Sequence, residues 1–266
     1  MAEYDDVIVV GAGKASAQMA ATVLEIMGAR VTGGHVVTKY DHTNNAVTGP
    51  ILVSEAAHPI PDEAGVAGGS AVVAAATAAT ERTLLFACIS GGGSALLVQP
   101  AQGITLSDMQ ETNALLLQSG ADITVMNTIR KHLSAVKGGN LALAAAPATV
   151  ISLVLSDVIG DPLESIASGP TVPDTSTFQD CWDIVQKFGL EGKFPAAVEA
   201  RLKNGCAGTV AETPKPGDLA FENTFTTVVR KHPPFVYPPF CVVSYTLRRR
   251  SFWWSRTIQM RAYAGY

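Results

Sequence analysis

Short runs of β-branched and apolar residues alternate with longer alanine-rich segments along the first two hundred positions. The strands that this pattern predicts are 7–10, 34–38, 51–53, 84–89 and 149–155, and the helices are 14–27, 62–80, 107–118 and 123–137. Pro61 and Asp62 are a helix start signal, and Ser107 is expected to cap the helix that it opens. Strands and helices in turn predict an α/β fold: a doubly wound, Rossmann-like, mostly parallel sheet with helices on both faces. Ligands of such sheets bind at the carboxyl ends of the strands.

A glycine run directly follows the strand 84–89. Its residues are Ser90, Gly91, Gly92, Gly93 and Ser94. Consecutive glycines let backbone N–H groups turn into one concavity, and such a nest between a strand end and a helix start attracts anions. The sequence therefore predicts a phosphate-type site here, with a loop that only connects strand to helix as the alternative.

The first strand ends in a second glycine loop, which contains Gly11, Gly13 and Lys14. The dinucleotide-binding fingerprint would need a third glycine where Ser16 stands and an acidic residue in place of Thr38-Lys39 at the end of the next strand. A lysine at a helix start opposes the helix dipole. We therefore expect Lys14 to face a phosphoryl oxygen, the alternative being a solvated surface lysine.

Two carboxylates, Asp157 and Asp161, follow the strand 149–155. Aspartate is common in turns for its own hydrogen bonds, so each alone is weak support for a site. At the same sheet edge as a phosphate loop, the pair favours Mg²⁺ coordination or the orientation of an attacking hydroxyl, with Asp157 the better placed of the two.

Two further segments carry secondary candidates for substrate contact. Glu55 and His58 follow the strand 51–53, and Arg130 and Lys131 lie in the basic helix 123–137. The first pair could contact a small acid, or His58-Pro59 could be only a turn. The second pair could clamp a carboxylate or phosphate, or form a solvated face near a helix C-terminus.

Composition limits the classes of protein that fit. The chain has 266 residues, of which 47% are hydrophobic, so it can bury a full core. A formal charge of −4 argues against nucleic-acid binding over most of the chain. No apolar run reaches the length of a membrane span and nothing near Met1 resembles a signal peptide. The four cysteines form no CxxC pair, so we expect a reducing, cytoplasmic setting without a disulfide framework.

Five ordered motifs resemble the amino-terminal domain of the class II glycerate 2-kinase family. They are VGAGKAS, SEAAHPIPD, ISGGGSALL, IRKHLSAVKGG and LSDVIGDPLESIASGPTVPD. The resemblance implies phosphorylation of D-glycerate at its C2 hydroxyl, with ATP and Mg²⁺. It implies that Lys14 is the catalytic lysine, that Asp157 is the catalytic aspartate, and that the loop Ser90 to Ser94 holds phosphate or the glycerate carboxylate. Neither nucleic acid nor a membrane is an expected partner, and a homo-oligomer stays open.

The pattern changes abruptly at position 230. Residues 1–229 carry 12 basic and 23 acidic side chains, whereas 230–266 carry seven basic side chains, no acidic one and two Pro-Pro pairs. We expect 1–229 to be the amino-terminal α/β domain and 230–266 to be an unrelated tail, a frameshift or splice product without regular structure. Family members continue with a second domain that closes the cleft, so its absence predicts impaired kinase activity. The alternatives are an NAD(P)H-dependent hydroxypyruvate reductase and a non-catalytic isoform that binds a partner.

Overall fold

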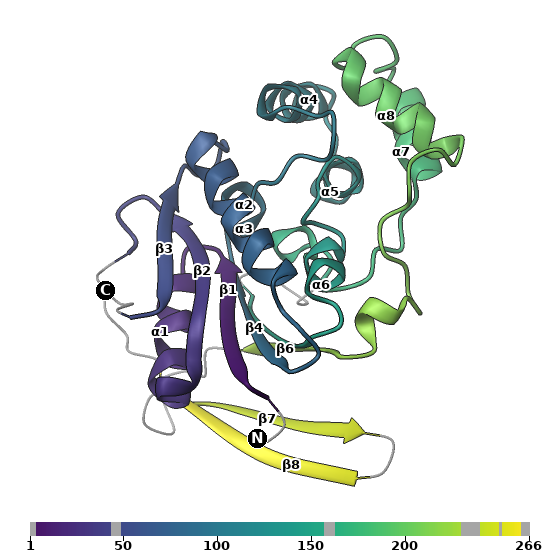
Figure 1. The fold of residues 1–266 in the computed structure, drawn as a ribbon. Coiled ribbons are helices and arrows are strands. Elements are labelled where there is room, and N and C mark those ends of the chain that lie inside the picture. Colours follow the sequence, from purple (N-terminus) through teal and green to yellow (C-terminus); the bar gives the residue numbers. More distant parts are fainter. Residues whose placement is uncertain (1–3, 44–48, 157–162, 230–239, 250–251, 262–266) are drawn as a thin grey trace.

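The structure is a computed structural model that describes residues 4–43, 49–156, 163–229, 240–249 and 252–261. A single parallel sheet runs through it. Its strands are β1 (Asp6–Ala12), β2 (Val31–Lys39), β3 (Ile51–Ala56), β4 (Thr83–Ser90), β5 (Thr149–Leu155) and β6 (Thr224–Val229). All five pairings are parallel, in the order β3-β2-β1-β4-β5-β6 (Figure 1). The predicted Rossmann-like sheet is confirmed, and the strand order reverses between β1 and β4, where such folds bind ligands.

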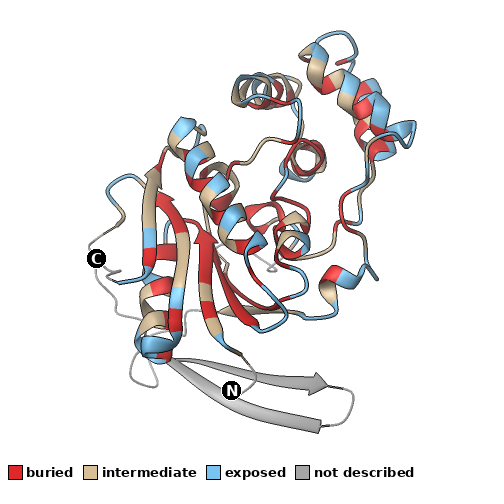
Figure 2. Ribbon diagram, in the orientation of Figure 1, coloured by how far each residue is buried: buried red, intermediate tan, exposed pale blue. Residues whose placement is uncertain are grey.

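Helices cover both faces of the sheet, as expected. Helix α1 (Ser16–Met27) packs Ala20 and Val23 against one face. Helices α2 (Glu63–Thr77) and α6 (Asn140–Ala145) pack against the other through Val72 and Leu141. Both faces of the central strands are therefore buried, which explains why β4 is buried at every position (Figure 2).

A second apolar cluster lies among four helices that are grouped apart from the sheet in Figure 1. They are α4 (Leu106–Gln118), α5 (Ile123–His132), α7 (Phe178–Lys187) and α8 (Ala196–Cys206). Leu116, Ile129, Phe178 and Leu202 are fully buried between them. The described part of the chain thus contains a helical core of its own beside the two sheet cores.

Short elements complete the described chain. These are α3 (Gly93–Leu96) and the 3₁₀ turns η1 (Gly28–Arg30), η2 (Ile166–Ser168) and η3 (Leu219–Phe221). No helix among the described residues is both long and apolar enough to cross a membrane.

The predicted helices shift at their ends: α1 begins at Ser16 and α2 runs from Glu63 to Thr77, and two further differences have a visible cause. Helix α4 is capped by Thr105, which forms a reciprocal capping box with Asp108, so the expectation that Ser107 is the cap is wrong. Helix α5 ends at His132 instead of continuing to 137, because the following backbone bonds to another segment. Ala101 N–H donates to the carbonyl of Leu133, and Ala135 N–H donates to the carbonyl of Gln99.

In the tail, the described backbone pairs β7 (Phe240–Arg249) with β8 (Phe252–Arg261) as an antiparallel ribbon. The sequence pattern had predicted no regular element there. The boundary at residue 229 and the origin of the tail stay predictions.

Candidate functional site

The loops that follow β1 and β4 meet at the point where the strand order reverses. Lys14 N–H donates to the carbonyl of Gly91 over 2.9 Å, and Ala15 N–H donates to Ser90 Oγ over 3.0 Å. The hydroxyls of Ser16 and Ser90 lie 3.3 Å apart. These contacts fix the position of Lys14 relative to the glycine run, so the structure brings together the two loops that the sequence singled out.

Lys14, Gly92 and His58 come from three loops and converge on one place. Gly92 adopts a left-handed conformation (φ +83°), and a Cβ there would lie 3.1 Å from His58 Cδ2 and 3.4 Å from Lys14 Cε. Lys14 is exposed, and its ammonium has no hydrogen bond or ion pair with the described residues. Partial burial, with repulsion from Lys14 and Lys39, lowers the pKa of His58, which keeps the imidazole neutral near pH 7. A free ammonium beside a glycine-lined loop suits an anionic group.

Beyond Gly93 the loop enters a chain of side-chain hydrogen bonds. Ser94 Oγ lies 2.7 Å from Ser168 Oγ, and Ser168 Oγ donates to Asn127 Oδ1 over 3.1 Å. Asn127 is 4% exposed, and its Nδ2 has no hydrogen-bond partner among the described residues. The segment 165–170 (SIASGP), which the sequence left as either an extension of the substrate pocket or a plain connection, therefore reaches the glycine loop through Ser168.

Lys137 lies behind the glycine loop and is 1% exposed. Its Nζ donates to the carbonyl oxygens of Ser94 (2.8 Å) and Leu97 (2.7 Å), near the end of α3. Burial, with a smaller contribution from repulsion by Arg130, lowers its pKa to about 7. Sequence reasoning had noted Lys137 only as the end of a basic helix.

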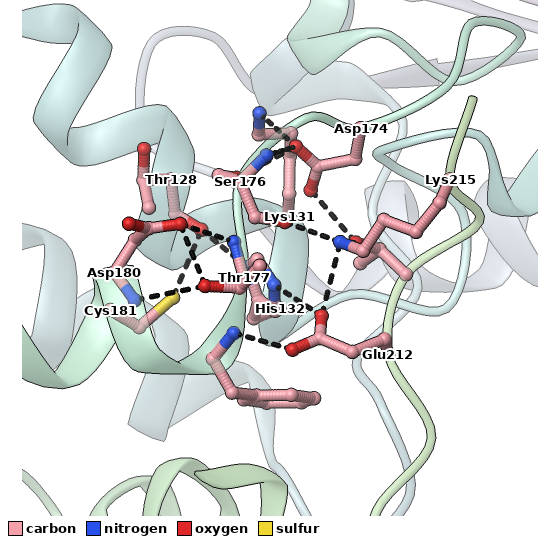
Figure 3. Close-up of polar contacts among 12 residues, drawn as sticks. Thr128, Lys131, His132, Asp174, Ser176, Thr177, Asp180, Cys181, Glu212 and Lys215 are labelled. Carbon is pink, nitrogen blue, oxygen red and sulfur yellow. Dashed lines mark hydrogen bonds and ion pairs between the residues drawn. The ribbon is translucent and has the colours of Figure 1, made fainter.

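Arg130 and Lys131 are adjacent in sequence but have different surroundings. Lys131 Nζ forms a buried ion pair of 2.6 Å with Asp174 Oδ1 (Figure 3). Asp174 also accepts hydrogen bonds from Ser176 and Thr213. Lys131 thus faces a structural carboxylate instead of the glycine loop. Arg130 donates from Nε to Asn113 Oδ1 over 2.7 Å, and burial lowers its pKa.

His132 belongs to the same structural network as Asp174. Its Nδ1 lies 2.8 Å from the carbonyl of Thr128, its Nε2 lies 3.2 Å from Glu212, and its ring packs edge-on against Phe178 (Figure 3). Burial lowers its pKa. These contacts describe a packed histidine that is held by its neighbours.

Glu55, at the carboxyl end of β3, is held by the turn that follows β2. Its Oε1 accepts hydrogen bonds from the backbone N–H and the hydroxyl of Thr43. The carboxylate therefore has local partners, and its contact with a substrate stays a prediction.

Asp157 and Asp161 lie outside the described residues. β5 does end beside β4, as their placement at the shared edge requires. Among the residues that the structure describes, no three His, Cys, Asp or Glu side chains cluster closely enough to hold a metal ion.

The fold and the edge geometry define a doubly wound α/β protein in which the loops after β1 and β4 meet at the switch point of the sheet. The chain belongs to the family described as "Domain of unknown function (DUF4147)", whose profile matches residues 1–203.

Relatives in this family carry two kinds of name. A protein of Agrobacterium vitis named putative hydroxypyruvate reductase is 46% identical over 81% of this chain and 47% of its own length. The D-glycerate 2-kinase of Thermotoga maritima is 44% identical over 70% of this chain and 45% of its own. The crystal structure of a Thermotoga maritima glycerate kinase matches with a TM-score of 0.76 at 37% identity, covering 85% of this chain and 51% of that one. The chain spans about half the length of the curated relatives it matches.

Proposed function

We propose that this chain is a kinase domain that phosphorylates D-glycerate to 2-phosphoglycerate with ATP. The observation that carries the proposal is the Lys14 ammonium, which has no partner among the described residues and lies beside left-handed Gly92 at the switch point of the sheet. Relatives named glycerate kinase or glycerate 2-kinase, at 40–48% identity, support the same substrate.

Phosphoryl transfer depends mainly on positioning and on neutralising charge at the transferred group. Lys14 supplies a compact positive charge, and the backbone hydrogen bond to Gly91 fixes the residue that carries it. His58 contributes a neutral ring next to Lys14 and adds no competing charge. Asp157 would orient or deprotonate the glycerate hydroxyl, and Asp157 and Asp161 would hold Mg²⁺, which would supply positive charge to offset that of the nucleotide.

The second candidate function is the reduction of hydroxypyruvate with NAD(P)H. Relatives from Agrobacterium vitis are named putative hydroxypyruvate reductase. The β1 loop does not favour it. Ser16, at the third-glycine position of the dinucleotide fingerprint, is buried and packs its hydroxyl against Ser90. Strand β2 ends in Thr38-Lys39, with no carboxylate at the strand end to bind a ribose hydroxyl.

An ADP-release assay on the purified chain, with D-glycerate, ATP and Mg²⁺, tests the proposal. We expect low turnover, because Lys14 is exposed and charge stabilisation is strongest where water is excluded. Lys14→Ala should lower that turnover by roughly a hundredfold, the usual loss of one transition-state donor. Lys193→Ala is the matched control, since Lys193 is an exposed loop lysine.

The same preparation distinguishes the alternatives. NADH oxidation with hydroxypyruvate that ignores ATP and survives Lys14→Ala would establish the reductase instead. Absence of ATP-dependent turnover together with absence of nucleotide binding would contradict the kinase and favour a non-catalytic binding protein.

A further inference from the structure

Five polar residues form a set of neighbours that joins α5 to the glycine loop. Asn127 Oδ1 accepts from Ser168 Oγ, and Ser168 Oγ lies next to Ser94 Oγ. The carbonyl of Ser94 accepts from Lys137 Nζ, and Lys137 is close enough to Arg130 for the guanidinium to lower its pKa. Arg130 lies three residues after Asn127 on α5, so the two are neighbours on the helix surface and the set closes on itself.

This set has donors that no described residue uses. Asn127 Nδ2 is buried without a partner. Arg130 donates a hydrogen bond from Nε to the neutral amide of Asn113. Its two Nη groups have no hydrogen bond or ion pair with the described residues. A buried donor without a partner is unfavourable, so Asn127 Nδ2 needs an explanation, whereas the Nη groups of Arg130 are only partly buried and are available to a ligand.

The charge of the set is also uncompensated. Arg130 is half-buried and Lys137 is fully buried, and neither basic group pairs with a carboxylate of the described residues. Lys131, the residue after Arg130, shows how a buried cation is usually compensated: it forms an ion pair of 2.6 Å with the Asp174 carboxylate. Two neighbouring cations without a counter-ion stabilise an anion that enters from outside.

A carboxylate fits these donors better than a phosphate. The Nη edge of Arg130 and the Nδ2 group of Asn127 offer a small number of N–H donors from planar groups, which suits two carboxylate oxygens. A phosphoryl group has more oxygens to satisfy, and the exposed ammonium of Lys14 beside Gly92 is available for it. The two anionic ends of the reaction would then lie on opposite sides of the glycine loop.

We propose that Asn127 and Arg130 bind the carboxylate of the small hydroxy acid, with Ser168 orienting the Asn127 amide and Lys137 holding the loop that carries Ser94. The identity of the acid as D-glycerate rests on the proposed kinase function. In this arrangement, Lys14, Gly92 and His58 bind the phosphate of the nucleotide.

Isothermal titration calorimetry on the full 266-residue chain tests this assignment with three probes: D-glycerate, glycerol, which lacks the carboxylate, and ADP. The wild type should bind D-glycerate and show no heat with glycerol. Arg130→Met should weaken D-glycerate binding by about tenfold or more, the usual loss of hydrogen bonds to a charged group, and should leave ADP binding within about twofold. Asn127→Ala should weaken D-glycerate in the same way, and Arg130→Lys should restore part of the affinity.

Arg201→Met is the matched control, because Arg201 is also half-buried and also donates its Nε to a single neutral group, the carbonyl of His132. It should leave D-glycerate binding unchanged. Thermal unfolding of each variant establishes that it is folded at the temperature of the titration.

Unchanged D-glycerate affinity in folded Arg130→Met would overturn the assignment, and so would a wild type that binds no D-glycerate. If Arg130→Met loses ADP binding and keeps D-glycerate binding, the nucleotide binds at Arg130. That result would overturn the carboxylate assignment and leave the kinase proposal intact. If the chain binds D-glycerate in a way that depends on Arg130 but binds no nucleotide, the carboxylate assignment would stand and the kinase proposal would fail.

Discussion

Lys137 Nζ donates a hydrogen bond of 2.8 Å to the carbonyl oxygen of Ser94, and the two residues are 43 positions apart in sequence. A second bond to the carbonyl of Leu97 means that one buried ammonium holds both ends of the short segment that follows the glycine run. The conformation of that run is therefore set from behind as well as by its glycines.

The buried ammonium should make stability depend on pH. Burial lowers the pKa of Lys137 to about 7 in the folded chain, while the unfolded chain keeps the ordinary lysine value near 10.5. Between these values the unfolded state binds more protons, so the free energy of unfolding should rise with pH from about 7 to about 10, by at most about 1.4 kcal/mol per pH unit. Urea unfolding across this range measures the slope.

Lys137→Met removes the titrating group, so its slope over the same range should be smaller than that of the wild type. The variant should also be less stable at high pH, because the carbonyls of Ser94 and Leu97 lose a donor. Lys193→Met, which changes an exposed lysine, should keep the wild-type slope. Equal slopes in the wild type and in Lys137→Met would show that Lys137 does not titrate in this window.

Gly92→Ala should reduce nucleotide binding more than it reduces stability. An alanine at φ +83° is strained by about 1–2 kcal/mol, and its methyl group would press on His58 and Lys14. Gly103→Ala is the matched control, because Gly103 has a similar φ of +80° and nothing within 4 Å of the added methyl. We expect similar losses of stability in urea unfolding, with ADP binding weakened only in Gly92→Ala. Equal ADP affinity in the two variants would remove Gly92 from the site.

Lys131→Met should unfold easily and yet bind D-glycerate normally while folded. Removing one partner of a buried ion pair typically costs about 3–5 kcal/mol, and Asp174 would remain buried at 0% side-chain exposure. Chemical denaturation gives the loss of stability, and titration with D-glycerate below the unfolding transition gives the affinity. A tenfold weaker affinity in the folded variant would return Lys131 to the list of substrate contacts.

Thr105→Ala should cost about 1 kcal/mol of unfolding free energy, because Thr105 caps α4 through the backbone N–H of Asp108. Ser107→Ala is the comparison: Ser107 is exposed and makes no side-chain hydrogen bond with the described residues, so we expect no measurable change. A larger loss in Ser107→Ala than in Thr105→Ala would contradict the observed cap.

The sheet could be predicted because its signal is local. Runs such as 84–89 and 149–155 are apolar throughout, and parallel strands buried on both faces have this pattern. The end of α5 could not be predicted, because Gln99 and Ala101 stop the helix through hydrogen bonds that sequence spacing does not reveal.

The candidate site also has one part that could be predicted from the sequence and one part that could not. Lys14 and the glycine run stand out because lysine at a helix start and three successive glycines are locally unfavourable without a ligand. Arg130 and Lys131 look equivalent in sequence, and only Asp174, 43 residues after Lys131, distinguishes them. Lys137 is hidden for the opposite reason: a lysine near a helix end appears solvated until the fold buries it.

The two sides of the proposed site belong to different hydrophobic cores. Lys14 and the glycine run stand on the sheet, whereas Asn127 and Arg130 stand on α5, whose Ile129 packs into the helical cluster with Leu116 and Leu202. The hydrogen bonds from Asn127 through Ser168 to Ser94 join these two parts, so the distance between the proposed phosphate and carboxylate groups depends on how the helical cluster packs against the sheet. We therefore expect a substitution deep in that cluster to affect binding through this distance, without any contact to a ligand.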